Sequence, residues 1–168
     1  MGYGFTWKGD SSNTTTCISP TCNTTGCSPS FGASALCAAG SVTADTSYKS
    51  VVGVGFNLNQ TTAAGATPGN HAAPATVTVT TVLSGAGTGN AAMRVQLTDS
   101  AGTSWCVDSG TWASGVAIAI GLFNTKCWAP TTGTFLTAGT NIVAVHVVIP
   151  GDATVDRPFS FCLTGATL

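Results

Sequence analysis

The sequence predicts an all-β fold, a two-sheet antiparallel β-sandwich of jelly-roll type, from three observations. The 168 residues are rich in Gly, Thr, Ser, Val and Ala and poor in Lys, Glu, Leu and Gln, which favours strands and turns over helices. Short segments of alternating apolar and polar residues recur between turns that contain Gly or Pro. With 43% hydrophobic residues, one domain of this length can bury a core.

The first 42 residues differ in composition from the rest of the chain. They carry four of the seven cysteines among Thr, Ser, Pro and Gly. We expect residues 1–42 to form a loop-rich, disulfide-stapled wrap that belongs to the same domain as the sandwich of residues 43–168.

The first alternating segment covers residues 51–59. Its two sets of side chains are Val52, Val54, Phe56 and Leu58 on one side and Gly53, Gly55, Asn57 and Asn59 on the other. This pattern predicts a half-buried strand with Phe56 toward the core and both asparagines facing away. A second strand is expected over residues 76–80, followed by the glycine-rich turn GAGTGN at 85–90.

A hairpin is predicted next. Met93, Val95 and Leu97 alternate with Arg94, Gln96 and Thr98, and the turn DSAG at 99–102 leads into a strand at 104–107. Further strands are expected over residues 116–123, over 141–149 with His146 on the polar side, and over 159–163. About eight short strands at this spacing are typical of a sandwich or jelly roll.

Two Trp–Cys neighbours, Trp105-Cys106 and Cys127-Trp128, predict a disulfide between Cys106 and Cys127. A loop of this length would be stabilised by about 3 kcal/mol. Seven cysteines indicate an oxidising, extracellular compartment and a secreted protein, and their odd number leaves at least one without an intrachain partner. The sequence leaves open the pairing of Cys17, Cys22, Cys27, Cys37 and Cys162.

Charge and motif content exclude several classes of function. Charged residues make up 7%, the net charge is −1 and every acid is Asp, so nucleic acid and anionic membranes are not expected partners. No apolar run approaches the ~20 residues that span a bilayer, so no membrane insertion is expected. Without a carboxylate pair outside turns, a Gly-x-Ser-x-Gly elbow or a metal triad, we expect neither catalysis nor a cofactor; a structural calcium ion stays open.

The residues expected on the polar strand face suit a neutral sugar. Planar amide and guanidinium groups bind hydroxyls, and an indole stacks on the C–H face of a sugar ring. An equally weighted alternative is that these are ordinary solvated strand residues. For Trp105 and Trp128 core packing beside the disulfide is slightly favoured, whereas Trp112 is expected to be exposed. The candidate ligand-binding residues are Asn57, Asn59, Arg94, Gln96, His146, Trp105, Trp112 and Trp128.

Five segments together resemble the carbohydrate-binding-module-like β-sandwich domains of secreted bacterial proteins that act beside polysaccharide-degrading enzymes. They are GVGFNLNQ (53–60), AMRVQLTD (92–99), SWCVD (104–108), FNTKCW (123–128) and VVIPG (147–151). The resemblance covers residues 37–168. It implies a jelly-roll domain that holds a glycan, has no catalysis of its own and accompanies a larger glycan-degrading protein.

A second hypothesis is a secreted cell-surface structural or assembly protein, the subunit of a filament or coat. The odd cysteine, the neutral surface rich in Thr and Gly, and edge strands with few charges favour it. A small hydrolase or oxidase is the least favoured class, because no acid–base pair is visible.

Overall fold

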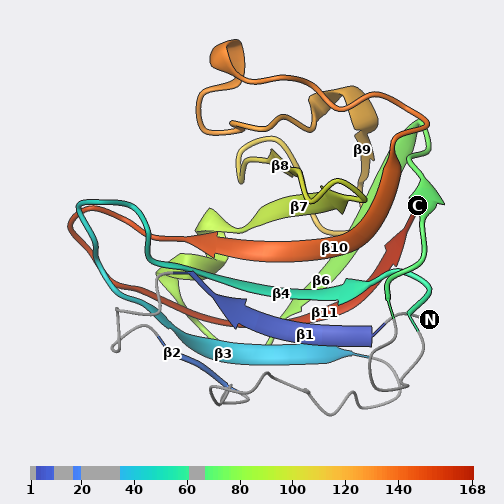
Figure 1. Cartoon of the computed structure of the whole chain (residues 1–168). Coiled ribbons are helices and arrows are strands. Elements are labelled where there is room, and N and C mark those ends of the chain that lie inside the picture. Colours follow the sequence, from blue (N-terminus) through green and yellow to red (C-terminus); the bar gives the residue numbers. More distant parts are fainter. Residues whose placement is uncertain (1–2, 10–16, 20–34, 61–66) are drawn as a thin grey trace.

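The computed structural model describes residues 3–9, 17–19, 35–60 and 67–168, and it confirms the predicted all-β sandwich of two antiparallel sheets (Figure 1). The first sheet has the order β1 (Tyr3–Lys8), β4 (Val51–Asn57), β10 (Asn141–Pro150), β7 (Arg94–Asp99) and β8 (Ser104–Val107). The short strand β5 (His71–Ala72) pairs with β10 outside this order. The second sheet has the order β2 (Cys17–Ser19), β3 (Leu36–Val42), β11 (Arg157–Thr167), β6 (Thr76–Leu83) and β9 (Ala117–Ala119).

The long strands β10 and β11 lie at the centres of the two sheets. β10 runs between β4 and β7, and β11 runs between β3 and β6. The last two strands of the chain therefore join the two halves of each sheet. The helical elements of the described residues are the short 3₁₀ turns η1 (Thr88–Ala92), η2 (Ile120–Leu122) and η3 (Pro130–Thr132). Within the described ranges, no helix has the length and apolar character needed to cross a bilayer.

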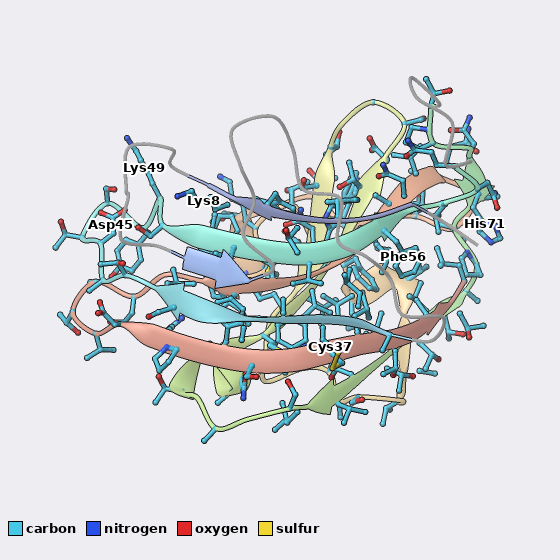
Figure 2. The ribbon with its side chains drawn as sticks, turned by 90° about the horizontal axis from the view of Figure 1, so that it is seen from below. Lys8, Cys37, Asp45, Lys49, Phe56 and His71 are labelled. Atoms are coloured by element: carbon cyan, nitrogen blue, oxygen red, sulfur yellow. A yellow bond between two sulfur atoms is a disulfide. The ribbon has the colours of Figure 1, made fainter. Side chains whose placement is uncertain are left out.

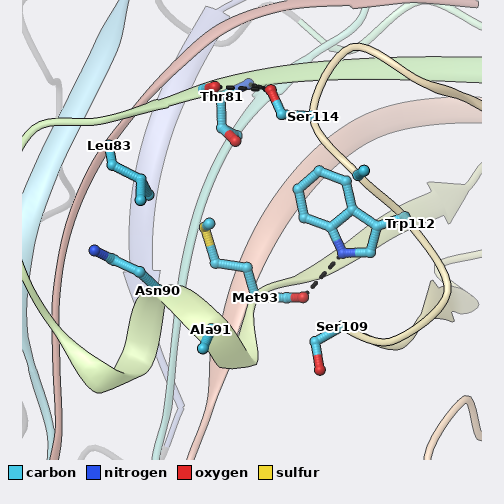
Figure 3. Close-up of a pocket in the computed structure, with 9 residues that line it drawn as sticks. Thr81, Leu83, Asn90, Ala91, Met93, Ser109, Trp112 and Ser114 are labelled. Carbon is cyan, nitrogen blue, oxygen red and sulfur yellow. Dashed lines mark hydrogen bonds between the residues drawn. The ribbon is translucent and has the colours of Figure 1, made fainter.

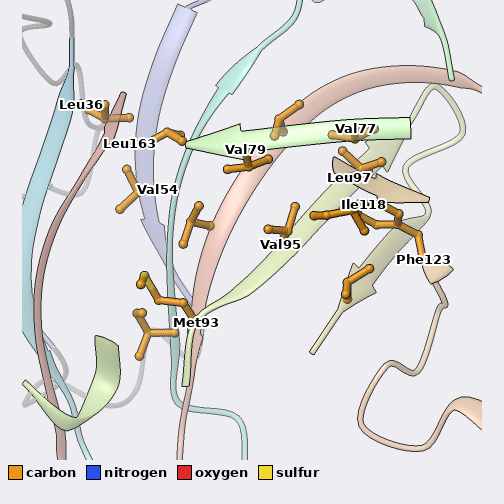
Figure 4. Close-up of a cluster of buried hydrophobic side chains, with 14 of the residues drawn as sticks. Leu36, Val54, Val77, Val79, Met93, Val95, Leu97, Ile118, Phe123 and Leu163 are labelled. Carbon is orange, nitrogen blue, oxygen red and sulfur yellow. The ribbon is translucent and has the colours of Figure 1, made fainter. Parts of the chain in front are cut away.

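The core lies between the sheets and follows from strand alternation. Every second residue of β10 is fully buried there, as Val145 and Val147 show, and Phe161 meets them from β11. Val77 and Val79 of β6 face Val95 and Leu97 of β7 (Figure 4). Removing each such aliphatic or aromatic side chain from water stabilises the fold by about 1.5–3 kcal/mol.

The predicted hairpin is confirmed, with Asp99 as its turn residue. Its Oδ1 accepts hydrogen bonds from the backbone N–H groups of Ala101 at 2.9 Å and Thr103 at 2.8 Å, and its Oδ2 accepts one from Trp105 Nε1 at 3.0 Å. Gly102 completes the turn at a φ of 83°, a conformation that glycine adopts without steric cost. Burial alone would raise the pKa of Asp99, but these hydrogen bonds outweigh it and lower the pKa.

The strand expected over residues 116–123 is wrong in length. Only Ala117–Ala119 pair with β6, and the chain then turns through η2. The turn is fixed where Ile120 N–H donates to Ala75 O at 2.9 Å, and it directs Phe123 into the core. Ile118 and Ile120 of this alternating segment are buried, whereas Val116 and Leu122 are exposed, so the alternation overestimates the strand at both ends.

The described parts of the first 42 residues supply strands of both sheets. β1 is an edge strand of the first sheet, and β2 and β3 belong to the second sheet, so the described part of this segment completes both sheets. Cys37 of β3 forms a disulfide with its register partner Cys162 of β11 (Figure 2), a pairing that the sequence left open. Cys22 and Cys27, and the side chain of Cys17, lie outside the described residues.

Candidate functional site

The face of the first sheet that points away from the core brings together several of the predicted site residues. Alternation places Asn57, Arg94, Gln96 and His146 on this face of three adjacent strands. In the register, His146 of β10 lies between Gly55 of β4 and Gln96 of β7, and Arg94 pairs with Val148.

His146 is only 7% exposed, and both of its ring nitrogens have partners within the protein. Trp7 Nε1 donates to Nδ1 at 3.2 Å, so the ring proton must sit on Nε2, which lies 3.1 Å from Thr98 Oγ1. The Phe5 ring meets the imidazole edge-on, with 5.1 Å between ring centroids. Burial lowers the pKa of His146 from 6.5 to about 4. The expected sugar-binding role of His146 is therefore replaced by a structural one, because no ring nitrogen is left for a ligand.

Two glycines of β4 explain how Trp7 reaches His146. A Cβ added at Gly53 would collide with the Trp7 indole, and one at Gly55 would collide with the carbonyl oxygen of Val145. Gly53 is therefore the floor on which the indole lies, and Gly55 leaves room for the close approach of β10 at His146. The Gly-Val-Gly signal was visible in the sequence, but its partner in β1 was not.

Arg94 stands at the centre of a second group, near the start of β7. Its Nε lies 2.6 Å from Asp108 Oδ1, just beyond the end of β8. Its Cζ lies over the Trp128 ring at 5.5 Å from the centroid, within the range of a cation–π contact. Trp128 is 60% exposed, whereas core packing was favoured for it. We call Arg94, Gln96, Asp108 and Trp128 the Trp128 patch.

The loop that carries Trp128 is anchored immediately beside it. The predicted disulfide between Cys106 and Cys127 is confirmed and ties the loop to β8. Asn124 is fully buried: its Oδ1 accepts from Lys126 N–H at 2.7 Å, and its Nδ2 donates to Pro130 O at 3.2 Å. Asn124 also exchanges two backbone hydrogen bonds with Cys106, of 2.8 and 2.9 Å. The loop is therefore held at three points, and the indole is exposed on a fixed support.

Gln96 extends the patch along the strand face. It pairs with Cys106 across β7 and β8, and its Nε2 donates to Ser104 Oγ at 3.3 Å. Asn57 lies on the same face but pairs with Ala144, four residues along β10 from the partner of Arg94, or about 13 Å away. Its Nδ2 donates to Gln60 Oε1 at 2.5 Å. Asn57 is therefore outside the Trp128 patch.

Asn59 does not lie on the strand face as expected. β4 ends at Asn57, and Asn59 follows in a turn with a φ of 51°, which Asn tolerates better than most residues. It is exposed, and its Cβ lies so close to Gly69 that a side chain at Gly69 would not fit. Its role is to shape the turn after β4.

The two remaining tryptophans are not in the patch. Trp105 pairs with Leu97 on the core side of β8 and is half-buried, as favoured from the sequence. Trp112 was expected to be exposed, but it packs against the core and donates its Nε1–H to Met93 O at 2.9 Å. It lines an open pocket of about 320 Å³ between β6, η1 and the segment that follows β8 (Figure 3).

The chemistry available at the Trp128 patch is recognition through stacking and hydrogen bonds. Asp108 is its single carboxylate and is engaged by Arg94. Among the described residues, no group of three or more His, Cys, Asp or Glu side chains is placed to hold a metal ion. Comparison with protein-family models, curated proteins and solved structures found no match to this chain.

Proposed function

We propose that this protein is a non-catalytic carbohydrate-binding module that holds a neutral polysaccharide at the Trp128 patch. The observation that carries the proposal is an indole that is 60% exposed although its loop is anchored by a disulfide and by buried Asn124. A large apolar side chain held rigidly in solvent is suited to ligand contact, because little conformational entropy is lost on binding.

The patch offers contacts both for the apolar face and for the hydroxyl groups of a sugar ring. Arg94 covers one face of the Trp128 indole, and the other face stacks on the apolar C–H side of a pyranose. The Asp108 carboxylate, the Gln96 amide and the remaining guanidinium N–H groups bind the hydroxyls at the ring edge. Stacking supplies affinity, and the polar groups supply orientation.

Charge within the patch favours a neutral glycan. Asp108 balances the charge of Arg94 at 2.6 Å, so the four patch residues carry no net charge. The single carboxylate also argues for binding without hydrolysis, since glycosidases use a pair of carboxyl groups. Two disulfides among the described residues support secretion, in which case a larger glycan-degrading protein is the natural partner.

Affinity electrophoresis and calorimetry over soluble glucans, xylans and mannans test the proposal. Trp128→Ala should weaken binding about tenfold or more, because ring stacking on an aromatic contributes on the order of 1–3 kcal/mol. Tyr48→Ala is the matched control, since Tyr48 is an exposed aromatic residue, at 68%, outside the patch. Absence of binding to every glycan, or equal losses in both variants, would refute the proposed function.

An assembly subunit is the second candidate. Its support is the short edge strand β9, flanked by Val116 at 55% and Leu122 at 47% exposure, with no charged side chain in Ala117–Ala119. An unprotected edge of this kind can pair with another chain. Size-exclusion chromatography with light scattering distinguishes the two candidates: concentration-dependent oligomers favour assembly, and a monomer that binds glycan favours the module.

A further inference from the structure

The pocket that contains Trp112 lies apart from the Trp128 patch on the other side of β7. Met93 faces the core and lines the pocket, whereas its neighbour Arg94 faces outward into the patch. The other walls come from β6, from η1 and from the segment between β8 and β9 (Figure 3). None of the nine described residues that line the pocket carries a charge.

Leu83 shows that the pocket is a gap in the apolar core. It follows Val77 and Val79 on the inward side of β6, and its register partner is the fully buried Phe161. Leu83 is nevertheless 58% exposed. An inward-facing leucine with this exposure means that the described part of the chain does not fill the space in front of it.

Three of the five polar side chains that line the pocket, those of Trp112, Ser114 and Asn90, are already paired. Trp112 Nε1 donates to Met93 O at 2.9 Å, and Ser114 Oγ donates to Thr81 O at 2.7 Å and accepts from Thr81 N–H at 2.8 Å. The Asn90 amide donates to Gly85 O at 3.0 Å and accepts from Ser160 N–H at 3.0 Å. These bonds hold the walls in place, so a ligand meets mainly apolar surface.

We propose that this pocket binds a small uncharged molecule that carries one aromatic or cycloaliphatic ring. Its volume of about 320 Å³ is at the small end of ligand sites, which span roughly 300–1,000 Å³. The indole face of Trp112 and the side chains of Met93 and Leu83 contact the ring. A sugar is disfavoured, because its hydroxyls would leave water for a site with few unpaired polar groups. The site is independent of glycan binding at the Trp128 patch.

The first experiment is NMR titration of the ¹⁵N-labelled full chain, with the Trp112 indole resonance assigned through Trp112→Phe. Phenol, benzyl alcohol and cyclohexanol are the probes, and glucose, mannose and xylose are the comparison ligands. We expect a saturable shift of the Trp112 indole resonance with at least one ring alcohol and none with the monosaccharides. Saturation by a monosaccharide instead, or no saturable shift with any ring alcohol, overturns the proposal.

Two neighbouring residues of β6 provide a matched pair of variants. Leu83 and Val82 are similarly exposed, at 58% and 54%, but point to opposite faces of the second sheet. Leu83→Asp places a charge in the pocket and should weaken the best-binding probe about tenfold or more, whereas Val82→Asp should leave its affinity unchanged. Equal effects would place the probe elsewhere and refute the site.

The Trp128→Ala protein separates this site from the proposed function. It should bind the ring alcohols as the unmodified chain does, even where its glycan affinity is lost. A parallel loss of both ligands would show one shared site and overturn the assignment. Conversely, ring-alcohol binding by a chain that holds no glycan would leave this site established while refuting the carbohydrate-binding module.

Discussion

Trp7 donates its indole N–H to Nδ1 of His146 at 3.2 Å across 139 residues of sequence. This contact ties the edge strand β1 to β10 over the glycines of β4. Its acceptor is a neutral imidazole, because burial holds the pKa of His146 at about 4. The same bond cannot form with a protonated ring, since both nitrogens of the imidazolium are donors.

The first prediction is a loss of stability as the pH falls from 6.5 to about 4. The pKa of His146 is 6.5 when unperturbed and about 4 in the folded chain, so over this interval the unfolded state binds the additional proton and is favoured. The full effect is about 3 kcal/mol, at about 1.4 kcal/mol per pKa unit. Urea unfolding at several pH values measures it.

Two variants test the assignment to His146. His146→Gln should flatten the dependence between pH 6.5 and 4, whereas His71→Gln, at an exposed position on β5, should preserve it. A dependence that survives His146→Gln would contradict the prediction. A further loss of stability below pH 4 is expected in all variants. Hydrogen bonds hold the pKa of Asp45 at about 2 and also lower the pKa of Asp152. Protonation of either carboxylate therefore removes its contribution to the stability of the folded state.

The second prediction concerns the glycine floor. Gly53→Ala should destabilise the fold by about 1–3 kcal/mol, because the new methyl group meets the Trp7 indole and forces it to move. In a Trp7→Ala background the same substitution should cost much less, since the obstructing ring is gone. Thermal or urea unfolding of the four proteins gives the coupling free energy. A cost that is equal in both backgrounds would show that Trp7 does not lie over Gly53.

Sequence patterns predicted those features of the structure that depend on residues close together in the chain. Alternation over residues 94–98 placed Arg94 and Gln96 on the outer face, and Asp99 was identified as a turn residue. The Trp–Cys pairs predicted the Cys106–Cys127 disulfide, which is confirmed. In each case the information lies within a strand or at the two ends of one short loop.

Contacts between distant segments were not predictable in this way. Trp112 was expected to be exposed and Trp128 to be packed, but the structure shows the opposite. A loop residue turns inward or outward according to its tertiary partners, which the local sequence does not contain. Met93 O holds Trp112 against the core, and Arg94 with the disulfide holds Trp128 in solvent. His146 likewise reads as a polar strand residue until the side chains of Phe5 and Trp7 from β1 are placed against it.

The third prediction separates the two disulfides by function. Replacing Cys106 and Cys127 by alanine should cost about 3 kcal/mol of stability and also weaken glycan binding, because Trp128 loses its anchor. Replacing Cys37 and Cys162 should cost about 5 kcal/mol, since their loop is longer, but leave the affinity of the folded fraction unchanged. Denaturation and calorimetry under conditions where both variants are folded provide the comparison. Equal affinity losses would contradict the assigned role of the Cys106–Cys127 bond.

The last prediction follows from the charge balance at the Trp128 patch. Asp108→Asn leaves Arg94 without its counter-ion, so the four patch residues acquire a net positive charge. Folding should be almost unaffected, because an ion pair of this exposure contributes about 0–1 kcal/mol. Binding of the neutral glycan should weaken, since the guanidinium loses its fixed orientation over Trp128.

Affinity for an acidic polysaccharide such as polygalacturonate should rise in the same variant and fall again with added salt, as expected for an exposed charge. Arg94→Lys is the control: it keeps the charge balance with Asp108 but loses the planar group over the indole. It should weaken the neutral glycan without creating affinity for the acidic one. If Asp108→Asn left the preference between neutral and acidic glycans unchanged, the ion pair would have no part in selecting the ligand, and Trp128 alone would define the site.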